Sequence, residues 1–234
     1  MTDFEYVGNE LELFAHAMVW KRYWAGEVRR YLGFRIADIG AGIGTNLALL
    51  GQAAQEWTCV EPDAELAAQI SAGLEARGFP FFCKVIVGTC ADLEKDTFDS
   101  LLYIDVLEHI ANDEVEMVTA AQRLRIGGHL IMLAPAHQFL YSPFDAAIGH
   151  HRRYSRPDIA RLTPPSLQPI LIRYLDSVGM IASLANRLML KASQPKLSEI
   201  RFWDRFMVPL SRLTDPITGY HIGKSLLCIW RRVN

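Results

Sequence analysis

Apolar runs that alternate with helical segments constrain this chain more than any other feature of its sequence. Five runs have the length and composition of buried strands: 35–39, 57–61, 82–87, 100–104 and 129–134. Between them, 63–77 and 112–125 have helical periodicity. Strands that are apolar on both faces and separated by helices build a parallel sheet covered on both sides. The sequence therefore predicts a doubly wound α/β fold.

Outside this alternating region the pattern is different. Residues 10–32 form one predicted amphipathic helix, and residues 135–157 are irregular and rich in histidine, arginine and aromatic residues. Beyond them we expect three helices and two strands: helices at 157–163, 179–192 and 198–213, and strands at 170–176 and 224–231.

Composition limits the classes of partner and compartment. The 234 residues carry a formal net charge of −2, so no global field attracts nucleic acid, and we expect no nucleic-acid partner. None of the four cysteines forms a CxxC pair, which indicates a reducing compartment. The amino terminus lacks a secretory pattern, and no apolar run approaches the ~18 residues of a membrane span. These features predict a cytoplasmic protein.

A glycine-rich turn joins the first strand to a helix. Asp38-Ile39-Gly40-Ala41-Gly42-Ile43-Gly44 lies between the run at 35–39 and the helical segment from Asn46. Glycines allow a sharp turn and the close approach of a ligand, and the following helix directs its positive end at that ligand. A dinucleotide fingerprint needs glycine at position 45, where Thr45 stands, so the spacing is G-x-G-x-G.

Two further acids follow the next strands. Glu61 ends the second strand, where a carboxylate can accept hydrogen bonds from both ribose hydroxyls, and Asp92 follows the third strand, where an adenine amino group could be bound. Together with the glycine turn and Asp105-Val106-Leu107-Glu108-His109-Ile110 after the fourth strand, these residues resemble the class I S-adenosylmethionine (SAM)-dependent methyltransferases. The resemblance covers roughly residues 30–135.

The resemblance implies a fold, a cofactor and a set of cofactor residues. It implies a mostly parallel seven-stranded sheet with an antiparallel last strand, in one domain over 1–234. That domain would comprise a helical cap at 1–32, a cofactor-binding core at 33–135, a substrate loop and helical insertion at 136–223, and the last strand at 224–234. The implied SAM-binding residues are Asp38, Gly40, Ala41, Gly42, Gly44, Asn46, Glu61, Pro62, Asp92, Leu93 and Asp105.

Histidines supply the candidate bases for an acceptor that must lose a proton. His109 follows the fourth strand, and His151 lies in the loop from His137 to Tyr154, which follows the fifth strand and should reach the carboxyl edge of the sheet. His109 could instead simply pack its helix. The candidate substrate-binding residues all come from that loop: His137, Tyr141, Asp145, His150, Arg152, Arg153 and Tyr154. We expect one arginine to pair with Asp145 while the other binds an anionic group of the acceptor.

Two other interpretations of these segments stay open. His137, Asp145, His150 and His151 are metal-ligand types, but their spacing matches no metal motif, so we predict that no metal is needed. Near the carboxyl terminus, an apolar stripe at helical spacing has Arg201, Arg205 and Arg212 around it and is interrupted by Pro209. Its members are Leu197, Ile200, Trp203, Phe206, Met207, Leu210 and Leu213. We expect core packing or a substrate lid, with attachment to a membrane surface as the less favoured alternative.

The sequence thus predicts a SAM-dependent enzyme that methylates a small molecule with a histidine as general base. An anionic acceptor and methylation on oxygen are the favoured interpretation. The alternatives are N-, C- or carboxyl methylation, a nicotinamide-dependent oxidoreductase, which the residue at position 45 argues against, and a SAM-binding module without catalytic activity. The acceptor and the oligomeric state do not follow from the sequence.

Overall fold

A computed structural model describes residues 10–77, 82–189 and 196–234. Its seven strands are β1 (Arg35–Ile39), β2 (Glu56–Glu61), β3 (Cys83–Val87), β4 (Phe98–Ile104), β5 (Leu124–Pro135), β6 (Leu167–Leu175) and β7 (Ser225–Arg232). Its α-helices are α1 (Glu10–Ala15), α2 (Met18–Val28), α3 (Thr45–Leu50), α4 (Ala64–Arg77), α5 (Asp113–Arg123), α6 (Pro143–Ala147), α7 (Arg156–Leu162), α8 (Ser177–Met189), α9 (Leu197–Phe202) and α10 (Val208–Ile217). The predicted helix at 179–192 extends at its end into residues that lie outside this description.

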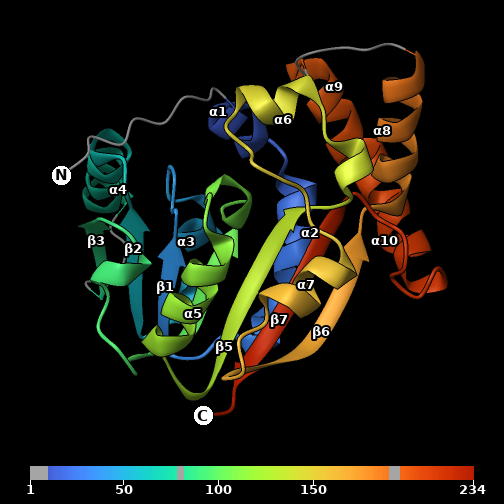
Figure 1. The fold of residues 1–234 in the computed structure, drawn as a ribbon. Coiled ribbons are helices and arrows are strands. Elements are labelled where there is room, and N and C mark those ends of the chain that lie inside the picture. Colours follow the sequence, from blue (N-terminus) through green and yellow to red (C-terminus); the bar gives the residue numbers. More distant parts are fainter. Residues whose placement is uncertain (1–9, 78–81, 190–195) are drawn as a thin grey trace.

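All seven strands belong to one twisted sheet with the order β3-β2-β1-β4-β5-β7-β6 (Figure 1). The first five strands pair in parallel, and β7 lies between β5 and β6 and is antiparallel to both. The predicted doubly wound sheet with an antiparallel last strand is therefore confirmed.

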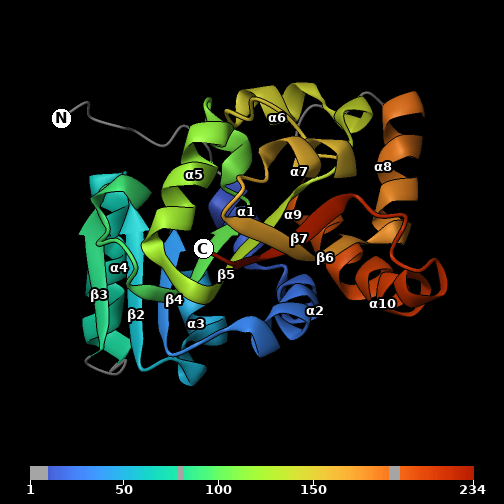
Figure 2. The same ribbon diagram turned by 60° about the horizontal axis from the view of Figure 1, so that its bottom comes forward.

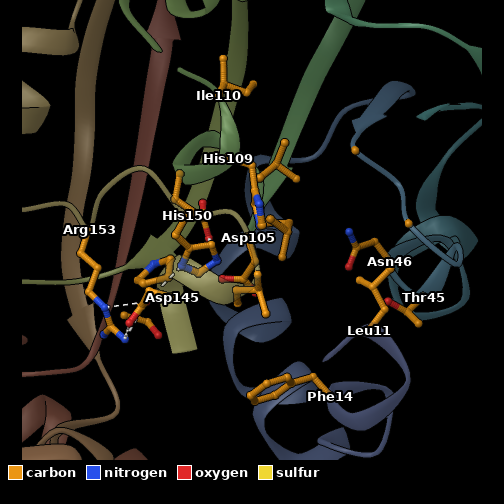
Figure 3. A pocket seen from close by; sticks show the side chains of 18 of the residues that line it. Leu11, Phe14, Thr45, Asn46, Asp105, His109, Ile110, Asp145, His150 and Arg153 are labelled. Carbon is orange, nitrogen blue, oxygen red and sulfur yellow. Dashed lines mark hydrogen bonds and ion pairs between the residues drawn. The ribbon is translucent and has the colours of Figure 1, made fainter. Parts of the chain in front are cut away.

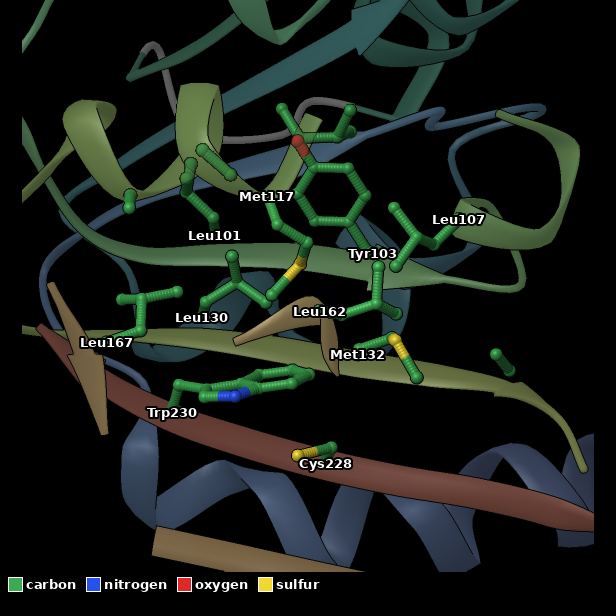
Figure 4. Close-up of a cluster of buried hydrophobic side chains, with 14 of the residues drawn as sticks. Leu101, Tyr103, Leu107, Met117, Leu130, Met132, Leu162, Leu167, Cys228 and Trp230 are labelled. Atoms are coloured by element: carbon green, nitrogen blue, oxygen red, sulfur yellow. The ribbon is translucent and has the colours of Figure 1, made fainter. Parts of the chain in front are cut away.

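Each face of the sheet carries its own core. Helices α5 and α7 cover one face, and α2, α3 and α10 cover the other (Figure 2). Side chains of β5 alternate between the two cores, with Leu130 and Met132 on one side and Ile131 and Leu133 on the other. Figure 4 shows the first of these cores around Met117 of α5 and Trp230 of β7. The strands are apolar on both faces because helices bury both faces of the sheet.

Several element boundaries differ from the predictions, and three of the differences have a clear structural reason. The predicted helix at 10–32 is divided into α1 and α2, and the Asp204 carboxylate, 185 residues from Val19, accepts hydrogen bonds from backbone N–H groups of the first turn of α2. The strand predicted at 129–134 begins at Leu124, since the Gly127-Gly128 pair forms an irregularity within β5 and does not end the strand. At the third boundary the predicted helix at 198–213 runs from α9 to α10, with a π-helical segment at Trp203–Met207 just before Pro209.

Within the described residues, no helix has both the length and the apolar content needed to cross a membrane.

Candidate active site

A cavity of about 870 Å³ lies at the carboxyl ends of β1, β2, β4 and β5 (Figure 3). β1 and β4 are neighbours in the sheet although two strands separate them in the chain, so the winding reverses between them. Open α/β sheets bind ligands in the crevice at such a reversal. Leu11 and Phe14 of α1 and Trp20 of α2 close one side of the cavity, and the loop after β5 contributes another side.

The glycine turn forms the wall of the cavity next to β1. Gly40, Gly42 and Gly44 have φ angles of 62°, 57° and 74°, which residues with a Cβ rarely adopt. A Cβ at Gly40 would lie 2.7 Å from a methyl carbon of Val106. Gly40, Ala41 and Gly42 line the cavity, whereas Gly44 lies at the amino-terminal cap of α3 outside the lining. The turn therefore needs glycine for its backbone shape and for close packing.

Glu61 connects this turn to the end of β2. Its carboxylate accepts hydrogen bonds from the backbone N–H of Gly42 at 2.8 Å and of Asp63 at 3.0 Å. Glu61 is buried, and burial raises its pKa. Both Glu61 and Pro62 line the cavity. A carboxylate oxygen can accept more than one hydrogen bond, so Glu61 can hold the turn and also meet the hydroxyls of a bound ribose.

Asp38 lies behind the turn and outside the cavity. Its Oδ1 accepts a hydrogen bond from Asn46 Nδ2 at 3.0 Å, and its Oδ2, fully buried, has no hydrogen-bond partner among the described residues. Burial raises its pKa to about 7. Asn46 does line the cavity (Figure 3). Asp38 thus positions Asn46 and does not itself face a ligand in the cavity.

The segment after β3 presents its backbone and not its acid to the cavity. The Asp92 carboxylate accepts hydrogen bonds from Thr89 N–H at 2.8 Å and from Thr89 Oγ1 at 3.1 Å, in a capping box. Gly88, Thr89 and Cys90 line the cavity, whereas Asp92 does not, and Leu93 is buried in the core. In this geometry Asp92 shapes the turn that a bound adenine would contact.

The segment after β4 brings two acids to the far wall. Asp105 has a φ of 56° and lines the cavity. Desolvation by the surrounding protein raises the pKa of Asp105 to about 6. The Glu108 side chain is fully buried, and neither carboxylate oxygen has a hydrogen-bond partner among the described residues. Burial, followed by the charge of Asp105, raises the pKa of Glu108 well above its ordinary value, so the neutral acid is favoured.

Beside these acids, His109 and His150 meet inside the cavity. Their rings stand edge to face with centroids 4.5 Å apart (Figure 3). His150 Nδ1 lies 3.1 Å from Asp145 Oδ1, and Arg153 donates to both oxygens of Asp145 at 2.9 Å. Burial would raise the pKa of Asp145, but the hydrogen bonds from His150 and Arg153 outweigh it and lower this pKa. Burial and then the neighbouring His150 lower the pKa of His109 to about 4.

Most of the remaining loop residues lie outside the cavity lining. Tyr141 lines the cavity and donates to the His150 carbonyl at 2.6 Å, whereas four others do not line the cavity: His137, His151, Arg152 and Tyr154. His137 stacks on Tyr174, and Tyr154 is buried. Arg152 pairs with Asp113. Arg153 forms the expected pair with Asp145, but Arg152 does not face the cavity as a site for an anion.

Sequence reasoning missed two lysines that line the cavity. Lys21 comes from α2, and Lys224 directly precedes β7. The Lys224 Nζ lies 3.8 Å from the centre of the Trp203 ring and 3.4 Å from an oxygen of Asp176, and burial lowers its pKa. An antiparallel strand begins at the edge where the parallel strands end, so the predicted topology could have placed Lys224 at the site.

One group of side chains has the ligand types for a metal ion. Glu108, His109 and His150 bring one ligand atom each to within 4.8 Å of the others. Of the four metal candidates in the sequence, the structure brings Asp145 and His150 together in the cavity but leaves His137 and His151 outside the cavity lining.

The residues that line the cavity could hold SAM. The Glu61 carboxylate is an acceptor for hydroxyl groups, and Trp20, Leu66 and Ile104 provide apolar walls. Comparison with known proteins agrees. Residues 37–132 match a family model described as a methyltransferase domain, and no curated protein sequence is significantly similar to the chain.

Solved structures, among them two methyltransferases, share the fold. A geranyl diphosphate methyltransferase in complex with SAM has a TM-score of 0.67 at 17% identity, with 97% of this chain and 91% of that chain covered. A geranyl diphosphate C-methyltransferase from Streptomyces coelicolor A3(2) has a TM-score of 0.64 at 13% identity over 90% of this chain and 77% of that one. The YcgJ protein from Bacillus subtilis has a TM-score of 0.61 at 18% identity over 92% of this chain and 99% of that one.

The fold is that of the class I SAM-dependent methyltransferases, and residues 37–132 match a methyltransferase domain. Residues 37–132 belong to the methyltransferase-domain family, and the protein is an enzyme that uses SAM as its cofactor.

Proposed function

We propose that this enzyme methylates a hydroxyl group of a small anionic molecule and that His150 accepts the hydroxyl proton. The observation that carries the proposal is the sequence of contacts from Arg153 through Asp145 to His150. An ionised Asp145 accepts the Nδ1–H of His150, which leaves the Nε2 lone pair directed toward Glu108 and His109. A carboxylate that fixes the tautomer and the orientation of a histidine prepares it to act as a base.

His109 complements this base. Because its pKa is lowered to about 4, its ring is neutral at physiological pH, and its one N–H can donate a hydrogen bond to the oxygen of the acceptor hydroxyl. When bound, SAM supplies a methyl group on a sulfonium centre, and the protein then needs to align the nucleophile with that carbon. In our proposal His109 holds the hydroxyl in line and His150 removes its proton. His109 thus remains at the site, as the sequence suggested. The role of base in the loop after β5, which the sequence suggested for His151, passes to His150.

Lysines support the anionic character of the acceptor. Lys21 and Lys224 line the cavity, and Arg153 is paired with Asp145. Nearby acids raise the pKa of both lysines in part, but burial dominates and lowers it. A carboxylate or phosphate on the acceptor would offset the cost of burying these two cations.

Three single variants test the base. We expect His150→Ala to lower the turnover number by roughly 10²–10⁴-fold and His109→Ala to raise KM and lower turnover less, with SAM affinity nearly unchanged in both. His151→Ala is the matched control, because its side chain is exposed and outside the cavity lining. The measurement is formation of S-adenosylhomocysteine against a panel of phenols and hydroxy acids. Full turnover in His109→Ala, His150→Ala and their double variant would exclude a histidine base and favour an acceptor that is already ionised, such as a carboxylate.

We also propose that no metal is required. Dialysis against a chelator should leave turnover unchanged, because the orienting contact on His150 comes from Asp145. Loss of activity that one divalent ion restores would contradict this, and the group formed by Glu108, His109 and His150 would then be the first site to examine.

A further inference from the structure

The helix that runs from Leu197 to Ile217 is apolar on two sides. Ile200, Trp203 and Val208 on one side are buried in the core. Five large apolar side chains on the other side are between 53% and 83% exposed: Phe202, Phe206, Leu210, Leu213 and Ile217. Spacings of three and four residues place them along one side of the helix, and we call them the exposed apolar stripe. The core therefore accounts for only half of the apolar pattern in this segment.

A neighbouring helix also exposes apolar side chains. α8 packs against α10, and the two lie side by side at the edge of the molecule that ends in β6 (Figures 1 and 2). Ile181 and Leu184 of α8 are also exposed. Single exposed apolar side chains are ordinary, but a contiguous series on one helix indicates a surface that contacts a partner.

The charges beside the stripe have one predominant sign. Arg201, Arg205 and Arg212 are exposed. The two aspartates of the segment point inward, where Asp204 caps α2 and Asp215 accepts a hydrogen bond from the Tyr23 hydroxyl at 2.7 Å.

Only one exposed acid lies in the described stretch from Lys196 to Ile217. This is Glu199, whose carboxylate accepts the backbone N–H of Lys196 at 2.9 Å. The surface around the stripe is therefore apolar and basic.

We propose that the exposed apolar stripe and its arginines bind the surface of an anionic membrane. An interfacial helix buries its apolar side chains at the boundary of headgroups and acyl chains, while arginines beside them contact anionic headgroups. A second copy of the chain suits the surface less well, because a symmetric contact would bring the same arginines against one another. The helix also supplies Glu199 and Trp203 to the cavity lining, so the membrane would lie close to the active site.

Vesicle sedimentation tests the proposal. Vesicles of phosphatidylcholine with phosphatidylglycerol should bind the protein, and vesicles of phosphatidylcholine alone should bind it more weakly. Phe206→Glu and Leu213→Glu should each weaken binding at least about tenfold, since a charge replaces an apolar side chain that the membrane would bury. Arg205→Gln should weaken binding roughly fivefold, and only to the anionic vesicles.

Matched controls separate the stripe from general effects. Ile126→Glu places the same charge at a site that is 69% exposed, against 68% for Leu213, and should leave binding unchanged. Lys95→Gln, at another exposed position, controls for Arg205→Gln. Calorimetry should give the same SAM affinity for all variants, which shows that they fold. Equal binding by Leu213→Glu and Ile126→Glu, or no binding to either vesicle, would overturn the proposal. A dimer that Leu213→Glu converts to a monomer in light scattering would instead assign the stripe to a second copy.

Discussion

Glu61 holds the backbone and also faces the cavity. One oxygen holds the glycine turn through Gly42, and the other holds the start of the next segment through Asp63. The same carboxylate lines the cavity beside the turn. We therefore expect one side chain to fix the position of the turn and to contact the cofactor.

Replacing Glu61 by alanine removes the charged acceptor for the ribose hydroxyls and frees the Gly42 N–H. We expect SAM binding to weaken by roughly 1.5–3 kcal/mol, about 10- to 100-fold in Kd. Calorimetry measures this, and Glu65→Ala, an exposed acid on α4, is the control. Unchanged SAM affinity in a folded Glu61→Ala protein would remove the assignment.

Asp38 gives the protein a specific pH dependence. Its pKa is about 7 in the folded state because of burial, above the ordinary value near 4. The folded state therefore holds a proton that the unfolded state has lost between about pH 4 and 7. This contribution to stability is complete below about pH 4 and is lost as the pH rises toward 7.

Asparagine at position 38 can keep an oxygen acceptor for Asn46 and cannot ionise. Asp38→Asn changes the free energy of unfolding at each pH. We expect this change to be about 2–4 kcal/mol more stabilising at pH 8 than at pH 4.5. Urea unfolding at the two pH values measures the difference, with the exposed Asp96→Asn as control. An effect of equal size at both pH values would show that Asp38 keeps its ordinary pKa.

At the scale of elements, Asp176 joins the last helices to the sheet. It follows β6 and accepts hydrogen bonds from Trp203 Nε1 at 2.7 Å and Ser211 Oγ at 2.6 Å. Lys224, which precedes β7, lies 3.4 Å away. Asp176 is fully buried and has a φ of 67°, so one residue sets both the end of a strand and the position of α10.

Asp176→Ala leaves several hydrogen-bond donors and a lysine without their acceptor. Alanine also tolerates a positive φ less well than aspartate, because it has no polar side chain to hydrogen-bond the local backbone. We expect it to lower the free energy of unfolding by about 3 kcal/mol or more. Asp176→Asn keeps an acceptor and tolerates this φ, so it should cost less. Urea unfolding gives both values, and the exposed Glu94→Ala should have almost no effect. Equal losses for alanine and asparagine would mean that the hydrogen bonds are not the source.

At the scale of the whole molecule, the cavity joins the N-terminal helices, the strand ends and the loop after β5. A ligand that binds there stabilises all of these elements together. At about 100 times its Kd, SAM should add about 2.7 kcal/mol to the free energy of unfolding and raise Tm by roughly 5–10 °C. NAD at the same concentration should leave Tm unchanged. An equal rise in Tm with NAD and with SAM would contradict the prediction, based on Thr45 in place of glycine, that the site does not bind a dinucleotide.

The sequence by itself determined the sheet, the glycine turn and the class of cofactor. Apolar runs and helical periodicity are local properties, and positive φ angles at Gly40, Gly42 and Gly44 need glycine wherever the chain goes. The place of Glu61 at the end of a strand follows in the same way from the order of the elements.

Tertiary structure decided which of several similar side chains face the cavity. His150 and His151 are adjacent in sequence, yet only His150 lines it, because Asp145 and Arg153 fix the path of the loop. Likewise, the stripe near the carboxyl terminus looks uniformly apolar in sequence, but the sheet buries Ile200 and Trp203 and leaves Leu213 exposed. Local patterns specify which elements form and how polar each residue is. The direction of a side chain depends on contacts between segments that lie far apart in the chain, such as the bonds from α2 to Asp204.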